Sequence, residues 1–97
     1  MKYAPETDVE VLIEEEIVVD EIKLYSVVVF NDEVNTFDFV IDTLMEVCEH
    51  SKEQAEQCTL IIHFKGKCSV KNGDVEDLTP IRNAICQRGM SAEILLR

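Results

Sequence analysis

The chain has 97 residues, of which 46% are apolar and 30% are charged, and this is the composition of one packed globular domain rather than of a low-complexity chain. Its net charge of −11 repels phosphate groups and no basic cluster offsets it, so we expect neither nucleic acid nor an anionic membrane as a partner. The longest apolar run is far shorter than the roughly 18 residues that cross a bilayer.

The four cysteines are 10, 10 and 18 positions apart and contain no CxxC pair, which is not the spacing of a metal site. No signal peptide precedes them, so we expect free thiols in a cytoplasmic protein. Three of them, Cys48, Cys58 and Cys86, fall on apolar stripes of predicted helices, where a thiol usually belongs to the core. We therefore expect no metal, no cofactor and no catalytic cysteine.

The first 22 residues hold eight acidic residues against one lysine, and their β-branched residues alternate with polar ones only in fragments. Such a stretch cannot bury much apolar surface. The sequence therefore predicts a flexible acidic N-terminal extension over residues 1–22 and a folded core over residues 23–97.

The first strand is predicted from Tyr25 to Phe30, a β-branched and aromatic stretch without charge. The polar residues 31–36 follow, and Asn35 and Thr36 can each cap a helix by accepting a hydrogen bond from a free backbone N–H. A helix is predicted next, because apolar residues recur there with the spacing of one helical face: Phe37, Val40, Ile41, Leu44, Val47 and Cys48.

Ser51 is predicted to start a second helix, since Gln54 stands three residues later as in a capping box. The helix is expected to end at Gly66. Residues 67–70 then predict a short strand, and the pair Asn72-Gly73 predicts a turn.

Thr79 and Pro80 have the types expected at the cap and first position of a third helix, and Gly89 is the type that ends one. Residues 93–96 predict the last strand. The order strand, helix, helix, strand, helix, strand predicts an α/β sandwich of the α+β kind, in which three helices cover one face of a three-stranded sheet.

One cluster of residues is a candidate binding site. Asn31, Asp32 and Glu33 follow the first strand, and three residues of the second helix share one face: Thr59, Ile62 and His63. If the first two helices form a hairpin, these groups converge on an apolar hollow with a rim of carboxylates, an amide and an imidazole. Such a rim suits a protonated amine, and in particular the amino terminus of a peptide.

Simpler interpretations exist for the same residues. His63 near a helix C-terminus is favoured by the helix dipole whether or not it binds anything. Residues 31–33 form a turn and capping cluster in any case. An enzyme using Cys58 as a nucleophile with His63 as its base is disfavoured, because residues five apart lie on different faces of a helix.

Three stretches of the chain carry a family resemblance, namely Tyr25-Ser26-Val27-Val28-Val29-Phe30-Asn31-Asp32-Glu33, Phe39-Val40-Ile41-Asp42-Thr43-Leu44, and His63-Phe64-Lys65-Gly66-Lys67 after Ala55. Together they resemble the ClpS family of Clp-protease adaptors, over residues 24–97. The resemblance implies a non-enzymatic adaptor of the N-degron pathway. Such an adaptor binds proteins that begin with Leu, Phe, Tyr or Trp and delivers them to a ClpA- or ClpC-type AAA+ unfoldase of the Clp protease.

The resemblance also implies roles for individual residues. Asn31, Glu33 and His63 resemble the groups that bind the substrate α-amine, with Asp32 beside them. The expected side-chain pocket consists of Val29, Asn35, Phe37, Val40, Thr43, Thr59, Ile62 and Ala92. Glu76 and Arg82 are candidates for unfoldase contact, residues 1–22 for engaging the unfoldase pore, and the free protein is expected to be a monomer.

Several positions depart from the family pattern and leave the preferred first residue open. Glu33 stands where the family usually has Asp, Asn35 where it has Thr, Thr36 where it has Pro, and Phe37 where it has Met. Thr59 and Ala92 are smaller than usual. A further alternative is a protein-interaction module of ribosomal-stalk-like fold, which would bind through its helix surfaces and need no free amine.

Overall fold

Three strands form one antiparallel sheet in the computed structural model, which describes residues 24–97; the predicted extension over residues 1–22 lies outside these residues. The central strand is β1 (Tyr25–Phe30), and β2 (Lys67–Gly73) and β3 (Ser91–Leu96) pair with it on either side. The observed order of elements confirms the predicted α+β class.

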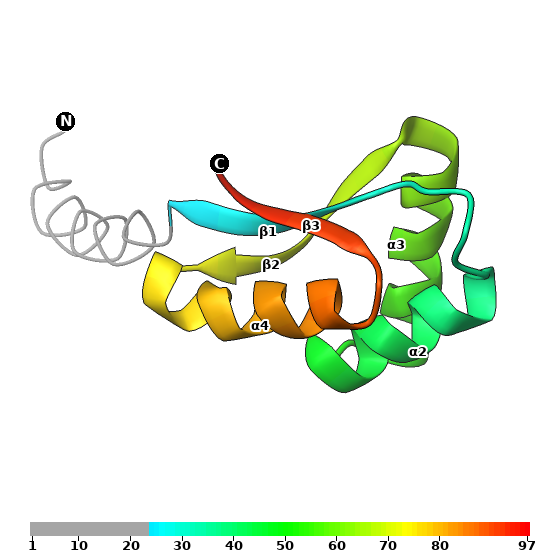
Figure 1. The fold of residues 1–97 in the computed structure, drawn as a ribbon, viewed down its shortest axis with the longest axis horizontal. Coiled ribbons are helices and arrows are strands. Elements are labelled where there is room, and N and C mark those ends of the chain that lie inside the picture. The colour runs from blue at the N-terminus through cyan, green and yellow to red at the C-terminus, as the bar shows by residue number, and fades with distance from the viewer. Residues whose placement is uncertain (1–23) are drawn as a thin grey trace, which may run out of the picture.

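The three helices lie mainly to one side of this sheet (Figure 1). Helix α4 (Val75–Gln87) runs along a face of the sheet, α2 (Phe37–Val47) lies on the same side, and α3 (Lys52–Lys65) stands across the end at which β1 leaves the sheet. The end of β1 is therefore the place where the sheet and the two helices α2 and α3 meet.

The core joins the sheet to all three helices. Val27 and Val29 of β1 are fully buried and pair with Ile94 and Ala92 of β3. The helices contribute buried apolar side chains at the spacing expected of a single inward face, among them Val40, Leu44, Ala55, Cys58, Ile62, Leu78 and Ile85. Burial of this face holds the helices against the sheet.

The caps predicted for the first two helices are present. The hydroxyl of Thr36 accepts a 3.1 Å hydrogen bond from the backbone N–H of Phe39, and the hydroxyl of Ser51 accepts one of 3.1 Å from Gln54. Gly66 ends α3 with φ of 93°, a left-handed conformation that side chains disfavour. These caps fix where α2 begins and where α3 begins and ends.

The expected turn at residues 72–73 and the expected helix start at Thr79 are wrong. β2 continues to Gly73, which pairs with Tyr25, and α4 begins at Val75. Burial explains the difference: Leu78 is 1% exposed and its side chain packs close to Gly73, so the first turn of α4 is anchored in the core.

Pro80 consequently lies inside α4 rather than at its start. A proline there has no N–H to donate to the carbonyl one turn earlier, which weakens the ladder of the helix locally. The hydroxyl of Thr79 donates a 2.6 Å hydrogen bond to the carbonyl of Val75 in the same turn. The burial of Leu78 therefore outweighs the preference of Pro80 for the first position of a helix.

All four cysteines are free thiols; Cys48 and Cys58 are buried, and Cys68 and Cys86 are partly buried. Burial raises the pKa of the Cys48 thiol to about 11 and that of Cys68 to about 12. Both thiols are therefore protonated at neutral pH and poor nucleophiles. Within residues 24–97, none of the helices is long and apolar enough to span a membrane.

Candidate functional site

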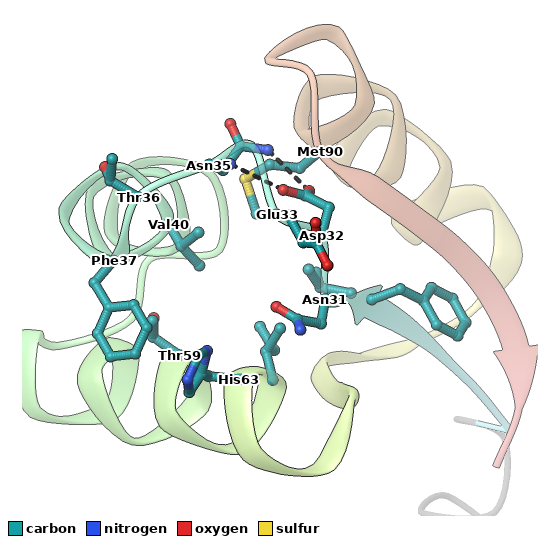
Figure 2. A pocket seen from close by; sticks show the side chains of 13 residues that line it. Asn31, Asp32, Glu33, Asn35, Thr36, Phe37, Val40, Thr59, His63 and Met90 are labelled. Carbon is teal, nitrogen blue, oxygen red and sulfur yellow. Dashed lines mark hydrogen bonds between the residues drawn. The ribbon is translucent and has the colours of Figure 1, made fainter.

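A cavity of about 400 Å³ opens where β1 ends, between the segment that follows β1, the first turn of α2, the last turns of α3 and Met90 (Figure 2). Its lining unites residues far apart in the sequence: Val29, Phe30, Asn31, Asp32, Glu33, Asn35, Thr36, Phe37, Val40, Thr59, Ile62, His63 and Met90. Residues 31–33 and the end of α3 therefore lie around one cavity, as the sequence predicts.

Backbone hydrogen bonds fix this convergence. The N–H of Asn31 donates to the carbonyl of Gly66 at 2.9 Å, and the N–H of Gly66 donates to the carbonyl of Ile62, also at 2.9 Å. The first bond ties the end of β1 to the end of α3. His63 lies on the last turn of α3, so its ring is brought beside the residues that follow β1.

Polar groups form the rim of the cavity. Asn31, Glu33 and His63 are all exposed, and Figure 2 shows Asn31, which directly follows β1, and His63 of α3 extending toward the same space. These three side chains offer an amide oxygen, a carboxylate and an imidazole nitrogen as acceptors. The thirteen lining residues include neither Lys nor Arg, so the rim favours a cation over an anion.

Asp32 is engaged within its own loop. One carboxylate oxygen accepts the N–H groups of Val34 and Asn35, each at 2.9 Å, and the other accepts the side-chain amide of Asn35 at 2.9 Å. The hydrogen bond from the Asn35 backbone is the main cause that holds the pKa of Asp32 below its ordinary value. Asp32 thus organises the segment that carries Asn31 and Glu33.

Apolar side chains form the inner wall. Val29, Val40, Ile62 and Met90 are between 0% and 9% exposed, so a ligand group that enters between them leaves water. Thr59 is 3% exposed and its hydroxyl donates to the carbonyl of Ala55 at 2.7 Å. Because that hydrogen bond satisfies the hydroxyl, Thr59 can line an apolar wall without an unpaired polar group.

Aromatic contacts hold the imidazole at the rim. The ring of His63 lies 5.1 Å from the ring of Phe37 and 4.8 Å from that of Phe64, both in edge-to-face orientation. Rings prefer this arrangement to face-to-face stacking. His63 is therefore oriented by the start of α2 as well as by its own helix.

The family model described as "ATP-dependent Clp protease adaptor protein ClpS" matches residues 20–93, a span that contains every residue that lines the cavity. The chain belongs to the ClpS family. The match confirms the resemblance found in the sequence.

Relatives in the ClpS family support the same assignment. The ClpS adapter protein of Nitratidesulfovibrio vulgaris is 35% identical over 72% of this chain and 70% of its own length, and that of Helicobacter hepaticus is 36% identical over 75% and 70%. The ClpS adapter protein of Campylobacter jejuni is 46% identical, but the match covers 47% of this chain and about half of the relative, 48%.

A solved ClpS structure has the same fold. The structure of Agrobacterium tumefaciens ClpS2 bound to L-phenylalaninamide superposes with a TM-score of 0.71, covering 78% of this chain and 99% of that one. The two sequences are 20% identical over this match, so the likeness concerns the fold alone.

Two residues expected from the ClpS resemblance do not line the cavity. Thr43 is fully buried one turn after Val40, and its hydroxyl accepts a 3.4 Å hydrogen bond from Arg88 instead. Ala92 is 6% exposed and is not part of the lining, whereas Met90, two residues earlier, is. Neither residue is therefore part of the cavity lining in this structure, and a role for them in holding a first side chain stays a prediction.

Three lining residues were missed, namely Phe30, Thr36 and Met90. Strand pairing carries a signal for Met90, because β3 runs antiparallel to β1 and Ser91 is opposite Phe30. The residue before Ser91 must then lie beside the residue after Phe30. Cys58, the nucleophile of the enzyme alternative, is buried and does not line the cavity.

Glu76 and Arg82, the expected unfoldase contacts, lie on α4 and away from the cavity lining. Glu76 is exposed in the first turn of the helix. Arg82 is half-buried, and its Nε atom is buried without a hydrogen-bond partner among the described residues. Their role in docking stays a prediction.

Proposed function

We propose that this ClpS-family chain binds the free amino terminus of other proteins together with a bulky apolar first side chain, that of Leu, Phe, Tyr or Trp. It then delivers these proteins to a ClpA- or ClpC-type AAA+ unfoldase of the Clp protease. The observation that carries the proposal is the cavity at the end of β1, whose acceptor-rich rim lies directly over an apolar wall.

The rim would hold the ammonium group. An α-amino group has a reference pKa of about 7.7 to 8.0, so it is mostly protonated at neutral pH. Its three N–H bonds match three acceptors, the amide oxygen of Asn31, the carboxylate of Glu33 and a ring nitrogen of His63. Hydrogen bonds to a charged group contribute roughly 1.5 to 3 kcal/mol each.

Asp32 would contribute its negative charge rather than a direct hydrogen bond to the ammonium group. Its low pKa keeps it ionised at neutral pH, so it adds a second negative charge beside Glu33 even though its oxygens already accept hydrogen bonds within the loop. Two carboxylates within one loop favour an ammonium group and disfavour an N-acetylated or acidic one.

The inner wall would hold the first side chain. The whole cavity has a volume of about 400 Å³, near the lower end of the range of small-ligand sites, which suits one residue rather than a folded segment. Burying a Leu or Phe side chain contributes about 1.5 to 3 kcal/mol. ClpS2 from Agrobacterium tumefaciens binds L-phenylalaninamide, a molecule with a free α-amine and an aromatic side chain, which supports the same division of roles here.

Delivery requires a second surface, for which Glu76 and Arg82 on α4 and the acidic extension of residues 1–22 are the proposed contacts. None of the residues that line the cavity lies on α4, so the two surfaces are formed by different residues. We propose that the protein acts in the cytoplasm and as a monomer when free.

A panel of peptides that differ only in their first residue tests the proposal. Peptides that begin with Leu or Phe should bind at least about tenfold more tightly than those that begin with Ser or Asp, because only the former fill the apolar wall. A substrate that begins with Phe should be degraded faster by the unfoldase and protease when this protein is added. Equal binding of the whole panel would contradict the proposal.

A further inference from the structure

The side-chain amide of Asn35 joins two segments beside the cavity, and Figure 2 shows the first of its two hydrogen bonds, to Asp32. Its nitrogen donates one hydrogen bond of 2.9 Å to the carboxylate of Asp32, within the segment after β1, and another of 3.1 Å to the backbone carbonyl of Gly89. These partners are three and 54 positions away in the sequence. Asn35 therefore connects the β1–α2 segment to the turn between α4 and β3.

That turn carries Met90 into the cavity. Gly89 has φ of 90° and its N–H donates to Cys86, so the chain reverses direction there and leaves α4. Met90 follows directly, is 5% exposed and lines the cavity. A thioether side chain is flexible and fills space of irregular shape, so its position depends on how its backbone is held.

The amide is the group that this connection requires. Two hydrogens on one nitrogen can reach an acceptor in the same loop and an acceptor in the other turn at once. A threonine hydroxyl has a single hydrogen, and a carboxylate has none at neutral pH. Asp32 also accepts the backbone N–H of Asn35, so the amide is held by the residue whose carboxylate organises the loop.

We propose that Asn35 is a positioning residue that sets which first side chains the cavity accepts, by holding Gly89 and thereby the Met90 part of the wall. This inference rests on the proposed function. Without the connection, the wall at Met90 can move away from Val40 and Ile62, so the cavity distinguishes less sharply between a small and a large first side chain.

Asn35→Asp is the direct test, because it keeps the shape of the side chain and removes both donated hydrogen bonds. Kd values are measured for two peptides that begin with Leu and with Trp and are otherwise identical. The ratio of these two Kd values should move toward one by about two- to tenfold, the range that one neutral hydrogen bond contributes to an equilibrium. Asn83→Asp, at an exposed position of α4, makes the same chemical change elsewhere and should leave the ratio unchanged.

The ratio separates positioning from loss of folded protein. A variant that is partly unfolded binds both peptides more weakly by the same factor, which cancels in the ratio. If Asn35→Asp does not fold, Asn35→Ser removes the same bridge without adding charge and carries the same expectation. An unchanged ratio in the folded variant overturns the inference.

A double variant distinguishes the two hydrogen bonds of Asn35. In Asp32→Asn with Asn35→Asp, donor and acceptor exchange places, so the bond within the loop can re-form while the Gly89 carbonyl still lacks its donor. The ratio should therefore stay at the value measured for Asn35→Asp alone. Return of the wild-type ratio overturns the inference, because it assigns selectivity to the loop alone.

The wild-type protein separates this inference from the proposed function. If it binds neither peptide more tightly than the N-acetylated forms, the proposed function fails and the inference fails with it. If it binds both but without preference, or if its preference survives in Asn35→Asp, the proposed function stands and only the role of Asn35 is overturned.

Discussion

The backbone N–H of Asn31 donates a 2.9 Å hydrogen bond to the carbonyl of Gly66, which joins the end of the central strand to the end of α3. Through this bond, a residue at position 31 and the ring at position 63 share the rim of one cavity. A backbone hydrogen bond thus sets where the β1 side and the α3 side of the rim meet.

Gly66→Ala should destabilise the fold by about 1 kcal/mol, because an alanine in the left-handed conformation brings its Cβ too close to the backbone. Contacts with the rest of the fold are not limiting, since no atom beyond Gly66 and its two chain neighbours lies within 4 Å of the position where the Cβ would stand. Urea denaturation measures the change. Gly73→Ala is the control, because its Cβ would make only ordinary contact with Leu78 at 3.5 Å; a larger cost at Gly73 would contradict this account.

Asp32 should make the stability of the protein depend on pH below the ordinary carboxyl range. The hydrogen bonds from Asn35 and Val34 lower its pKa from 3.8 in the folded state, so the unfolded chain binds this proton more readily. Stability from Asp32 is therefore present above pH 3.8 and is lost as the pH falls through the folded pKa.

Asp32→Asn should remove that part of the acid dependence, as measured by urea denaturation at a series of pH values below pH 5. Asp42→Asn, at an exposed position of α2, also removes one negative charge and serves as the control. If both variants keep the acid dependence of the wild-type protein, the hydrogen bonds of Asp32 do not stabilise the folded loop.

Cys48 and Cys68 should react slowly with iodoacetamide at pH 8 in the native protein. Burial raises the pKa of both thiols, to about 11 and about 12, so little thiolate is present. Mass spectrometry of timed samples gives the rate at each cysteine, with the urea-unfolded chain as the reference. Native rates as fast as unfolded ones would show that the two thiols are not protected by the core.

His63→Ala should weaken binding of a peptide that begins with Phe by at least about tenfold, which corresponds to about 1.4 kcal/mol. The variant removes one proposed acceptor for the ammonium group and the ring that contacts Phe37. Gln57→Ala, at an exposed position of the same helix, should bind like the wild-type protein. Fluorescence anisotropy measures the affinity of each variant for this peptide. Equal affinities would show that His63 does not take part in binding.

Much of the fold follows from local signals that the packing does not oppose. The uncharged run at β1 and the caps at Thr36 and Ser51 each predict an element that the structure has. The start of α4 could not be predicted in this way, because Asn72, Gly73 and Pro80 are turn residues by preference, whereas Leu78 is held in the core. The burial of Leu78 in the tertiary structure sets the start of α4. Neighbouring residues in the sequence do not reveal that burial.

The polar half of the site could be predicted better than the apolar half. Residues 31–33 and 63 are adjacent to clear element ends, so their meeting follows from the order of elements. The place of Met90 in the cavity lining could be predicted only from the pairing of β3 with β1. The absence of Thr43 from the lining depends on which side of α2 faces Arg88. The amide connection from Asn35 to Gly89 spans 54 positions and has no sequence signal.

The most direct measurement compares the affinity of this protein for a peptide that begins with Phe and for the same peptide with an acetylated amino terminus. Acetylation removes the positive charge and two of the N–H bonds that Asn31, Glu33 and His63 are proposed to accept, while the side chain stays unchanged. We predict that the acetylated peptide binds at least about tenfold more weakly. Equal affinity for the two peptides would contradict the central claim that the rim of this cavity recognises a free amine.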